Sequence, residues 1–234
     1  MEMQLRLIVV LLACVPLLAD AAENAFKDTF NVDEKNFVSS GKNKYWILEP
    51  GYQLVFEGKE DGKKLQLTIT VLREIKKFGN VETRVVEEKE TDDGQLTEIS
   101  RNYFAMDKTT NDLYYFGEDV DTYKDGKVTG HGGSWQHGKD GAKYGLIMPA
   151  TPKVGDRYCQ ELAPGVAEDR AEIKALDEKV KTPAGKFENC LKVEETSALE
   201  PGNKEFKYYA PDVGLIRDGE LKLAKYGKTD ESAK

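Results

Sequence analysis

The chain has 234 residues, a formal net charge of −8 and hydrophobic residues at 39% of its positions. This acidic balance argues against nucleic acid and anionic lipid head groups as partners, because both are bound by basic surfaces. The length is enough to bury a sizeable core and suits one all-β domain.

The N-terminus has the features of an export signal. Arg6 precedes an apolar run that ends at Leu18, and Ala19 and Ala21 are small residues with the spacing that a signal peptidase needs. The run is too short to stay in a bilayer as an anchor. We therefore predict a cleaved signal peptide at residues 1–21, an exported protein that is periplasmic or secreted, and no transmembrane segment after cleavage.

A second interpretation of this region is lipid attachment. Cys14 follows Leu11, Leu12 and Ala13, a sequence similar to a weak lipobox. Cleavage there would leave Cys14 as a lipid-bearing N-terminus. The apolar residues that continue after Cys14 favour the ordinary signal peptide.

The rest of the chain is dominated by strand signals. A short helix is expected near residues 23–30, in an otherwise polar stretch. Residues 65–71 then alternate apolar and polar side chains with a period of two, which is typical of a strand with one buried face. Residues 169–181 fit either a helix or a strand, and the antiparallel context favours a strand.

Turn residues recur about every ten positions and divide the chain into about eleven or twelve strands. Short turns place sequence neighbours side by side in a sheet. We predict a mainly β fold, in which one antiparallel meander forms a curled half-barrel, a barrel or a sandwich with little helix. The single domain is expected at residues 22–225, followed by a polar tail at 226–234.

The segment 113–137 carries the most information. Asp125-Gly126 is a strong signal for a two-residue hairpin turn. If this turn sets the register, Phe116 lies opposite Trp135, and His131 lies diagonal to Glu118 on the same face.

This register suggests two kinds of chemistry. Glu118 and His131 could form an acid/base pair. Asp119, Asp121, His131 and His137 could hold a metal ion. The alternative for both is structural: histidines that are hydrogen-bonded among packed aromatic rings, beside a solvated sheet edge.

A curled sheet also offers a concave face for a ligand. Such sites are mostly apolar with few polar groups. The candidate ligand-binding residues are Trp46, Phe56, Tyr114, Phe116 and Trp135. The expected ligand is an apolar or amphipathic small molecule, and the sequence indicates no particular cofactor.

Two cysteines lie beyond the predicted signal peptide, Cys159 and Cys190. An oxidising compartment would permit a disulfide between them, whereas two separate core thiols are the alternative. CxxC and zinc-ribbon spacings are absent from the sequence.

Several long strings resemble a widespread set of uncharacterised secreted bacterial proteins. They are GEDVDTYKDGKV, HGGSW, GLIMPATPKVGD, APGVAED, TPAGKFENCLKVEE and KYYAPDVGLI. The resemblance covers roughly residues 100–217 and implies a bacterial exported protein, without a catalytic residue or an activity. The meander and the closing residues 208–215 are also similar to periplasmic half-barrels of the lipoprotein-carrier type, which shelter acyl chains in a curled sheet.

Three functions remain open at this point. The first is a non-catalytic module that binds an apolar or amphipathic ligand on a curled sheet. The second is an envelope structural or interaction protein without a pocket, whose aromatic residues interlock into a dry core. The third is a metal-dependent protein or a hydrolase centred on residues 118–137.

Overall fold

The computed structural model describes residues 25–229. The predicted signal peptide, Cys14 and the last residues of the predicted tail lie outside this range. Within it, regular helix is limited to one 3₁₀ turn at Glu34–Asn36, so the short helix expected near residues 23–30 does not form over residues 25–30. The prediction of a mainly β fold is confirmed.

The described residues form eighteen strands. In chain order they are β1 (Phe37–Val38), β2 (Gly41–Asn43), β3 (Trp46–Leu48), β4 (Tyr52–Glu60), β5 (Lys63–Phe78), β6 (Val81–Asp92), β7 (Gln95–Asp107), β8 (Leu113–Lys124), β9 (Lys127–Gly130), β10 (Trp135–Gln136), β11 (Lys143–Met148), β12 (Arg157–Cys159), β13 (Glu161–Leu162), β14 (Asp169–Thr182), β15 (Gly185–Ser197), β16 (Glu205–Ala210), β17 (Gly214–Asp218) and β18 (Leu221–Lys228). The ambiguous residues 169–181 are a strand, and β18 extends the domain beyond residue 225.

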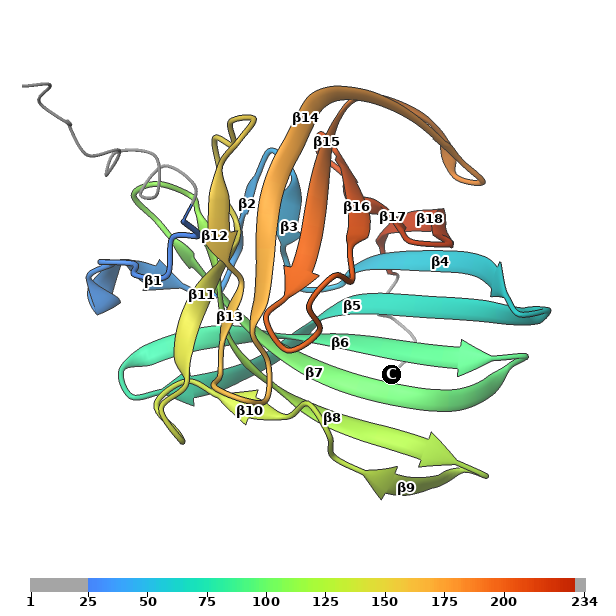
Figure 1. Ribbon diagram of the computed structural model, residues 1–234, viewed down its shortest axis with the longest axis horizontal. Coiled ribbons are helices and arrows are strands. Elements are labelled where there is room, and N and C mark those ends of the chain that lie inside the picture. Colours follow the sequence, from blue (N-terminus) through green and yellow to red (C-terminus); the bar gives the residue numbers. More distant parts are fainter. Residues whose placement is uncertain (1–24, 230–234) are drawn as a thin grey trace, which may run out of the picture.

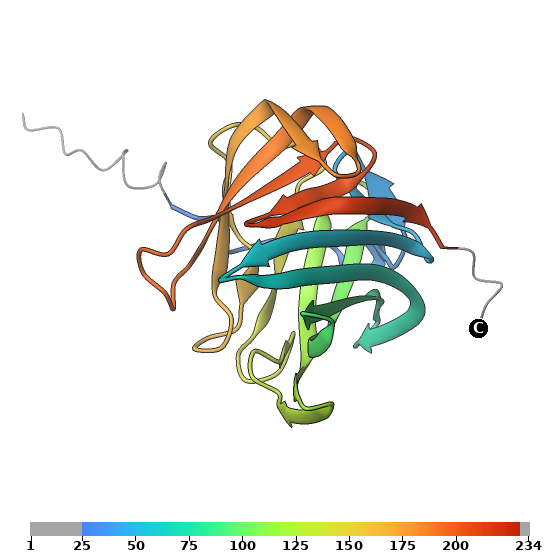
Figure 2. The ribbon, with the colours of Figure 1, turned by 90° about the vertical axis from the view of Figure 1, so that its right-hand side faces the viewer.

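Sixteen of these strands belong to one antiparallel sheet, which curls until it is nearly a closed barrel (Figure 1, Figure 2). Its main path runs β12-β14-β15-β16-β17-β18-β4-β5-β6-β7-β8-β11-β13. Most neighbours in the sheet are neighbours in sequence, as short turns predict. Hairpin turns such as Asp125-Gly126 have positive φ at both residues, 52° and 72°, which matches the twist of the flanking strands.

The two ends of this path come from one short segment. Strand β12 pairs with β14, β13 pairs with β11, and Gln160 is the residue between them. Gly145 of β11 lies against this segment so closely that a Cβ atom there would be 2.2 Å from the carbonyl oxygen of Gln160. A glycine at this position therefore lets the two margins of the sheet meet.

Strands β2 and β3 form a separate hairpin that packs inside the curled sheet. The ring of Trp46 on this hairpin lies 5.3 Å from the ring of Phe104 in β7 and 6.3 Å from the ring of Tyr209 in β16. Its contacts therefore link strands that are distant in the sheet.

A β-bulge interrupts β8. Tyr115 pairs with Phe104 and Glu118 pairs with Asn102, so two residues of β8 face one residue of β7. Gly117 in this bulge has φ of 132°, and a Cβ atom there would lie 2.3 Å from the carbonyl oxygen of Trp135.

The structure corrects the predicted register of the 113–137 hairpin. Lys124 lies opposite Lys127 as predicted, but the register shifts between Thr122 and Tyr123. The register moves by one more residue between β9 and β10, so Trp135 lies opposite Glu118 and not opposite Phe116.

Candidate functional site

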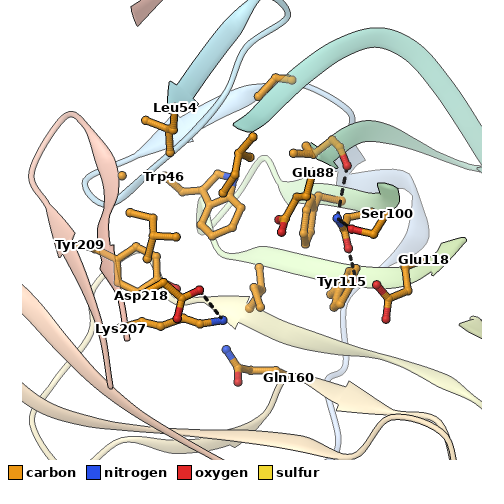
Figure 3. Close-up of a pocket in the computed structure, with 18 of the residues that line it drawn as sticks. Trp46, Leu54, Glu88, Ser100, Tyr115, Glu118, Gln160, Lys207, Tyr209 and Asp218 are labelled. Atoms are coloured by element: carbon orange, nitrogen blue, oxygen red, sulfur yellow. Dashed lines mark hydrogen bonds and ion pairs between the residues drawn. The ribbon is translucent and has the colours of Figure 1, made fainter. Parts of the chain in front are cut away.

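The inward faces of the curled sheet line a partly open cavity of about 250 Å³ (Figure 3). Its apolar part is lined by aromatic and branched side chains from strands on several sides. These residues are Trp46, Ile47, Tyr52, Leu54, Ile69, Val71, Val86, Phe104, Tyr115, Ile147, Tyr209, Val213 and Leu215. The side chain of Trp46 is only partly buried, because one side of it faces this space.

The polar part of the cavity is strongly acidic. Seven carboxylates and one lysine line it: Glu88, Glu98, Glu118, Glu161, Asp169, Glu195, Asp218 and Lys207. Lys207 of β16 projects from one wall with Asp218, while Glu88 and Glu118 project from the opposite wall (Figure 3).

Lys207 is held between two of these acids. Its Nζ atom lies 2.9 Å from Oε2 of Glu195 and 3.6 Å from Oδ2 of Asp218. Burial opposes the charge of Lys207, but Asp218 and Glu195 raise its pKa well above the ordinary lysine value. The ammonium group is therefore charged and already paired within the protein.

Other carboxyl groups in the cavity retain their protons more strongly than exposed acids do. Burial, reinforced by Asp218 and Glu118, raises the pKa of Glu88 to about 8. Burial also raises the pKa of Glu118 to about 7, although the nearby hydroxyl of Tyr115 lowers it. The pKa of Glu161 is raised well above its ordinary value by burial and by Asp169 and Glu118.

A hydrogen-bonded wall holds one side of the cavity in place. The side-chain amide of Asn102 donates to the carbonyl oxygen of Val86 at 3.4 Å and to the Ser100 hydroxyl at 3.1 Å. The hydroxyl of Tyr115 donates to the amide oxygen of Asn102 (Figure 3). Because these groups are partnered, the wall is fixed before any ligand arrives.

A second hollow of about 360 Å³ adjoins the acidic part. Five residues line both spaces: Glu118, Glu161, Asp169, Glu195 and Lys207. The second hollow continues to Leu199, which is 45% exposed in the connection between β15 and β16. The acidic groups therefore lie between the aromatic part of the cavity and the protein surface.

The structure places the five predicted ligand-binding residues in different surroundings. Trp46 lines the cavity. Phe56 is fully buried in the core and Trp135 packs edge-on against Tyr115 with ring centroids 5.3 Å apart, and neither lines the cavity.

Tyr114 and Phe116 belong to an aromatic cluster that is separate from the cavity. The ring of Phe37 lies 5.5 Å from Tyr114 and 5.1 Å from Phe116, both edge-on. Tyr144 stacks on Phe116 at 4.9 Å. This cluster is close-packed, as expected of a core.

The structure separates the residues of the predicted acid/base pair. Nδ1 of His131 lies 2.9 Å from Oδ1 of Asp121 and 3.1 Å from the carbonyl oxygen of Val120, and the side chain of His131 is 70% exposed. Glu118 points into the cavity instead.

The predicted metal ligands also have other partners. Asp119 accepts hydrogen bonds from Tyr103 and, at 2.7 Å, from Gln136. His137 accepts a hydrogen bond from the backbone of Tyr144 at 3.2 Å, and burial lowers its pKa. Within residues 25–229, no group of three or more His, Cys, Asp or Glu side chains is placed to hold a metal ion.

Cys159 and Cys190 are both buried free thiols. Cys159 pairs with Arg170 of β14, and Cys190 pairs with Glu178 further along the same strand. At about 3.3 Å per residue, these two positions on β14 are about 26 Å apart along the strand. A disulfide needs Cα atoms within about 7 Å, so the two cysteines are not bridged in this fold.

Sequence reasoning missed most of the cavity. Glu98, Ser100, Asn102 and Phe104 alternate along β7 and all face inward. A strand whose inward face carries polar residues beside an aromatic one indicates an internal cavity, because a dry core would not accept them without partners. The alternation of polar residues along β7 was therefore the signal from which the cavity could have been predicted.

Comparisons with protein-family models, curated proteins and solved structures found no match to this chain. In the described part of the chain, no helix has the length and apolar character needed to cross a membrane.

Proposed function

We propose that this protein is a non-catalytic binding module that holds a small amphipathic molecule inside its curled sheet. The observation that carries this proposal is a cavity of about 250 Å³ with an aromatic part and a separate polar part. Concave sites of this composition, with a few placed polar groups, are the usual form of small-molecule sites.

The size of the cavity limits the ligand. Sites for drug-sized molecules have volumes of roughly 300–1,000 Å³. A space of about 250 Å³ lies just below that range and suits a compact molecule better than a long acyl chain. The cavity therefore does not support the acyl-chain cargo that the resemblance to lipoprotein carriers implies.

The aromatic residues distinguish this proposal from a pocketless interaction protein. Phe37, Phe116 and Tyr144 interlock into a dry cluster, as that alternative expects. Trp46 and Phe104 are in contact with each other, with ring centroids 5.3 Å apart. Unlike the rings of the dry cluster, both also border the cavity. Space beside buried aromatic rings favours ligand binding.

Native mass spectrometry tests the proposal on protein purified from the envelope of its natural host without added ligand. We expect an organic adduct that is lost on denaturation. A bare polypeptide mass, in protein prepared gently enough to keep other known complexes intact, would count against a resident ligand. The same spectrum tests the predicted signal cleavage after residue 21 and lipidation at Cys14.

A pair of variants links the adduct to the cavity. Ser100→Leu places a larger side chain on the inward face of β7, where Ser100 lines the cavity. Thr97→Leu changes the same strand at a position that does not line it. We expect the adduct to disappear in Ser100→Leu and to persist in Thr97→Leu.

A further inference from the structure

We infer that the ligand is a small organic cation: an amine or quaternary ammonium group attached to an apolar body. This inference rests on the proposed binding function and adds the charge of the ligand. Its basis is an excess of acidic over basic side chains in the cavity, next to aromatic rings and a tyrosine hydroxyl that has no protein partner.

The imbalance remains after the internal ion pairs are counted. Lys207 is the one basic side chain among the described residues that line the cavity, and it is engaged by Glu195 and Asp218. The carboxyl groups without a basic partner there are Glu88, Glu98, Glu118, Glu161 and Asp169. They come from β6, β7, β8, β13 and β14, so they surround the polar part of the cavity from several sides.

A buried carboxylate without a counter-charge is costly, and in the empty protein the group keeps its proton instead. The raised pKa values of Glu88 and Glu118 agree with this description of the empty site. A positively charged ligand would replace the protons and satisfy the carboxylates. An anionic ligand would meet the same acids with no free cation to receive it.

The aromatic residues supply an independent indication. Tyr209 is only 3% exposed and lines the cavity, yet its hydroxyl forms no hydrogen bond with any residue in the range 25–229. A hydroxyl that borders the cavity without a protein partner is available to a ligand. Trp46 and Phe104 border the same space and offer apolar surface to the body of such a ligand.

The acidic part and the aromatic part of the cavity are arranged as such a ligand needs. The acids line both the cavity and the second hollow, whereas the aromatic side chains line the cavity alone. A molecule with an apolar body can place that body among the rings while its charged group stays beside the carboxylates. The aromatic space beyond the acids favours this ligand over a bare metal ion, which would leave it unused.

Isothermal titration calorimetry at pH 8 tests the inference with matched probes. The members of each set share one apolar body and differ in the end group, which is an amine, an amide or a carboxylate. Tryptamine, indole-3-propionamide and indole-3-propionate form the first set. Two further sets have naphthyl and hexyl bodies. We expect the amine of at least one set to bind at least ten-fold more tightly than its amide, and the carboxylate to bind most weakly.

Two sets of substitutions test whether the amine binds beside the carboxylates of the cavity. In the double variant Glu88→Gln/Glu161→Gln we expect at least a ten-fold loss of amine affinity and unchanged amide affinity. Glu60→Gln, an exposed carboxylate at the β4–β5 turn, is the control and should leave both unchanged. A thermal unfolding curve confirms that each variant is folded.

The outcomes separate the two proposals. If an amide or carboxylate binds as tightly as its amine, the cation inference is overturned and the binding function stands. If Ca²⁺ or Mg²⁺ alone binds more tightly than every amine, the organic cation is also overturned. If no probe of any set binds, the binding function fails, and this inference fails with it.

Discussion

Lys207 and Asp218 lie opposite each other in β16 and β17, and Glu195 approaches Lys207 from β15 on the other side. The lysine therefore neutralises acids on both neighbouring strands. Removing it would leave two partly buried carboxylates without a cation.

Lys207→Met is expected to lower the free energy of unfolding at pH 8 by about 2–3 kcal/mol. Breaking a buried ion pair costs about 3–5 kcal/mol, and the effect is reduced here because the side chain of Lys207 is 27% exposed. Urea unfolding measures the difference. Lys179→Met, which removes an exposed pair with Glu188, is the control and should change stability by less than about 1 kcal/mol. Equal effects of the two substitutions would contradict the role given to Lys207.

Stability should fall as pH rises through the neutral range. Glu88 has a pKa of about 8 and Glu118 a pKa of about 7 in the folded protein, both above the ordinary value of 4.5. The folded state therefore binds these protons more tightly than the unfolded state, and its stability declines from about pH 4.5 to pH 8. The positive charge of Lys207 lowers the pKa of Glu88, whereas the negative charge of Asp218 raises it.

Thermal unfolding between pH 5 and pH 8.5 measures this slope. Glu88→Gln mimics the protonated side chain, so the variant should lose part of the decline and be relatively more stable at pH 8. Glu60→Gln should follow the parent protein. A parent protein whose midpoint is flat or rises over this interval would show that Glu88 and Glu118 ionise normally.

Trp46 is expected to report ligand binding by fluorescence. The protein has two tryptophans, and only Trp46 lines the cavity. In Trp135→Phe, a saturating amine with a hexyl body should shift or quench the emission, because it displaces solvent beside Trp46. In Trp46→Phe, where only Trp135 emits, the same addition should leave the spectrum unchanged. The reverse pattern would place the ligand outside the cavity.

Gly117→Ala tests the bulge in β8. The positive φ and the 2.3 Å approach to the Trp135 carbonyl leave no room for a Cβ atom. We expect a loss of at least about 2 kcal/mol in unfolding free energy. Gly132→Ala lies in the same hairpin region with open space around it, and should cost less than about 1 kcal/mol. If Gly117→Ala lowered the unfolding free energy no more than Gly132→Ala does, the bulge would be able to relax at little cost.

The sequence predicted the architecture better than the site. One reason is a local irregularity of β8 that changes which side chains face the cavity. Strand alternation and short turns were sufficient for a mainly β meander that curls. The bulge at Gly117 was not predicted, and it turns Glu118 to the face that Tyr115 occupies, where regular alternation would place them on opposite faces.

Long-range closure was equally outside the reach of sequence patterns. Glu161 joins the cavity because β13 pairs with β11, and Asp169 joins it because it begins β14. No local signal states which strands will face each other across a curled sheet. The acidic character of the site follows from this tertiary arrangement, as does the separation of Cys159 from Cys190.

The continuous segment around Gln160 has a consequence for how the protein behaves in a crowded compartment. Strands with unpaired edges can recruit other chains and start aggregation. Here the sheet's two terminal strands belong to one short piece of chain, and Lys27 bonds to the backbone of Arg157 and Cys159, at 3.0 and 2.9 Å, along the edge of β12. The β12 end of the main path is thereby covered against pairing with another copy, and this cover depends on a residue near the start of the described chain.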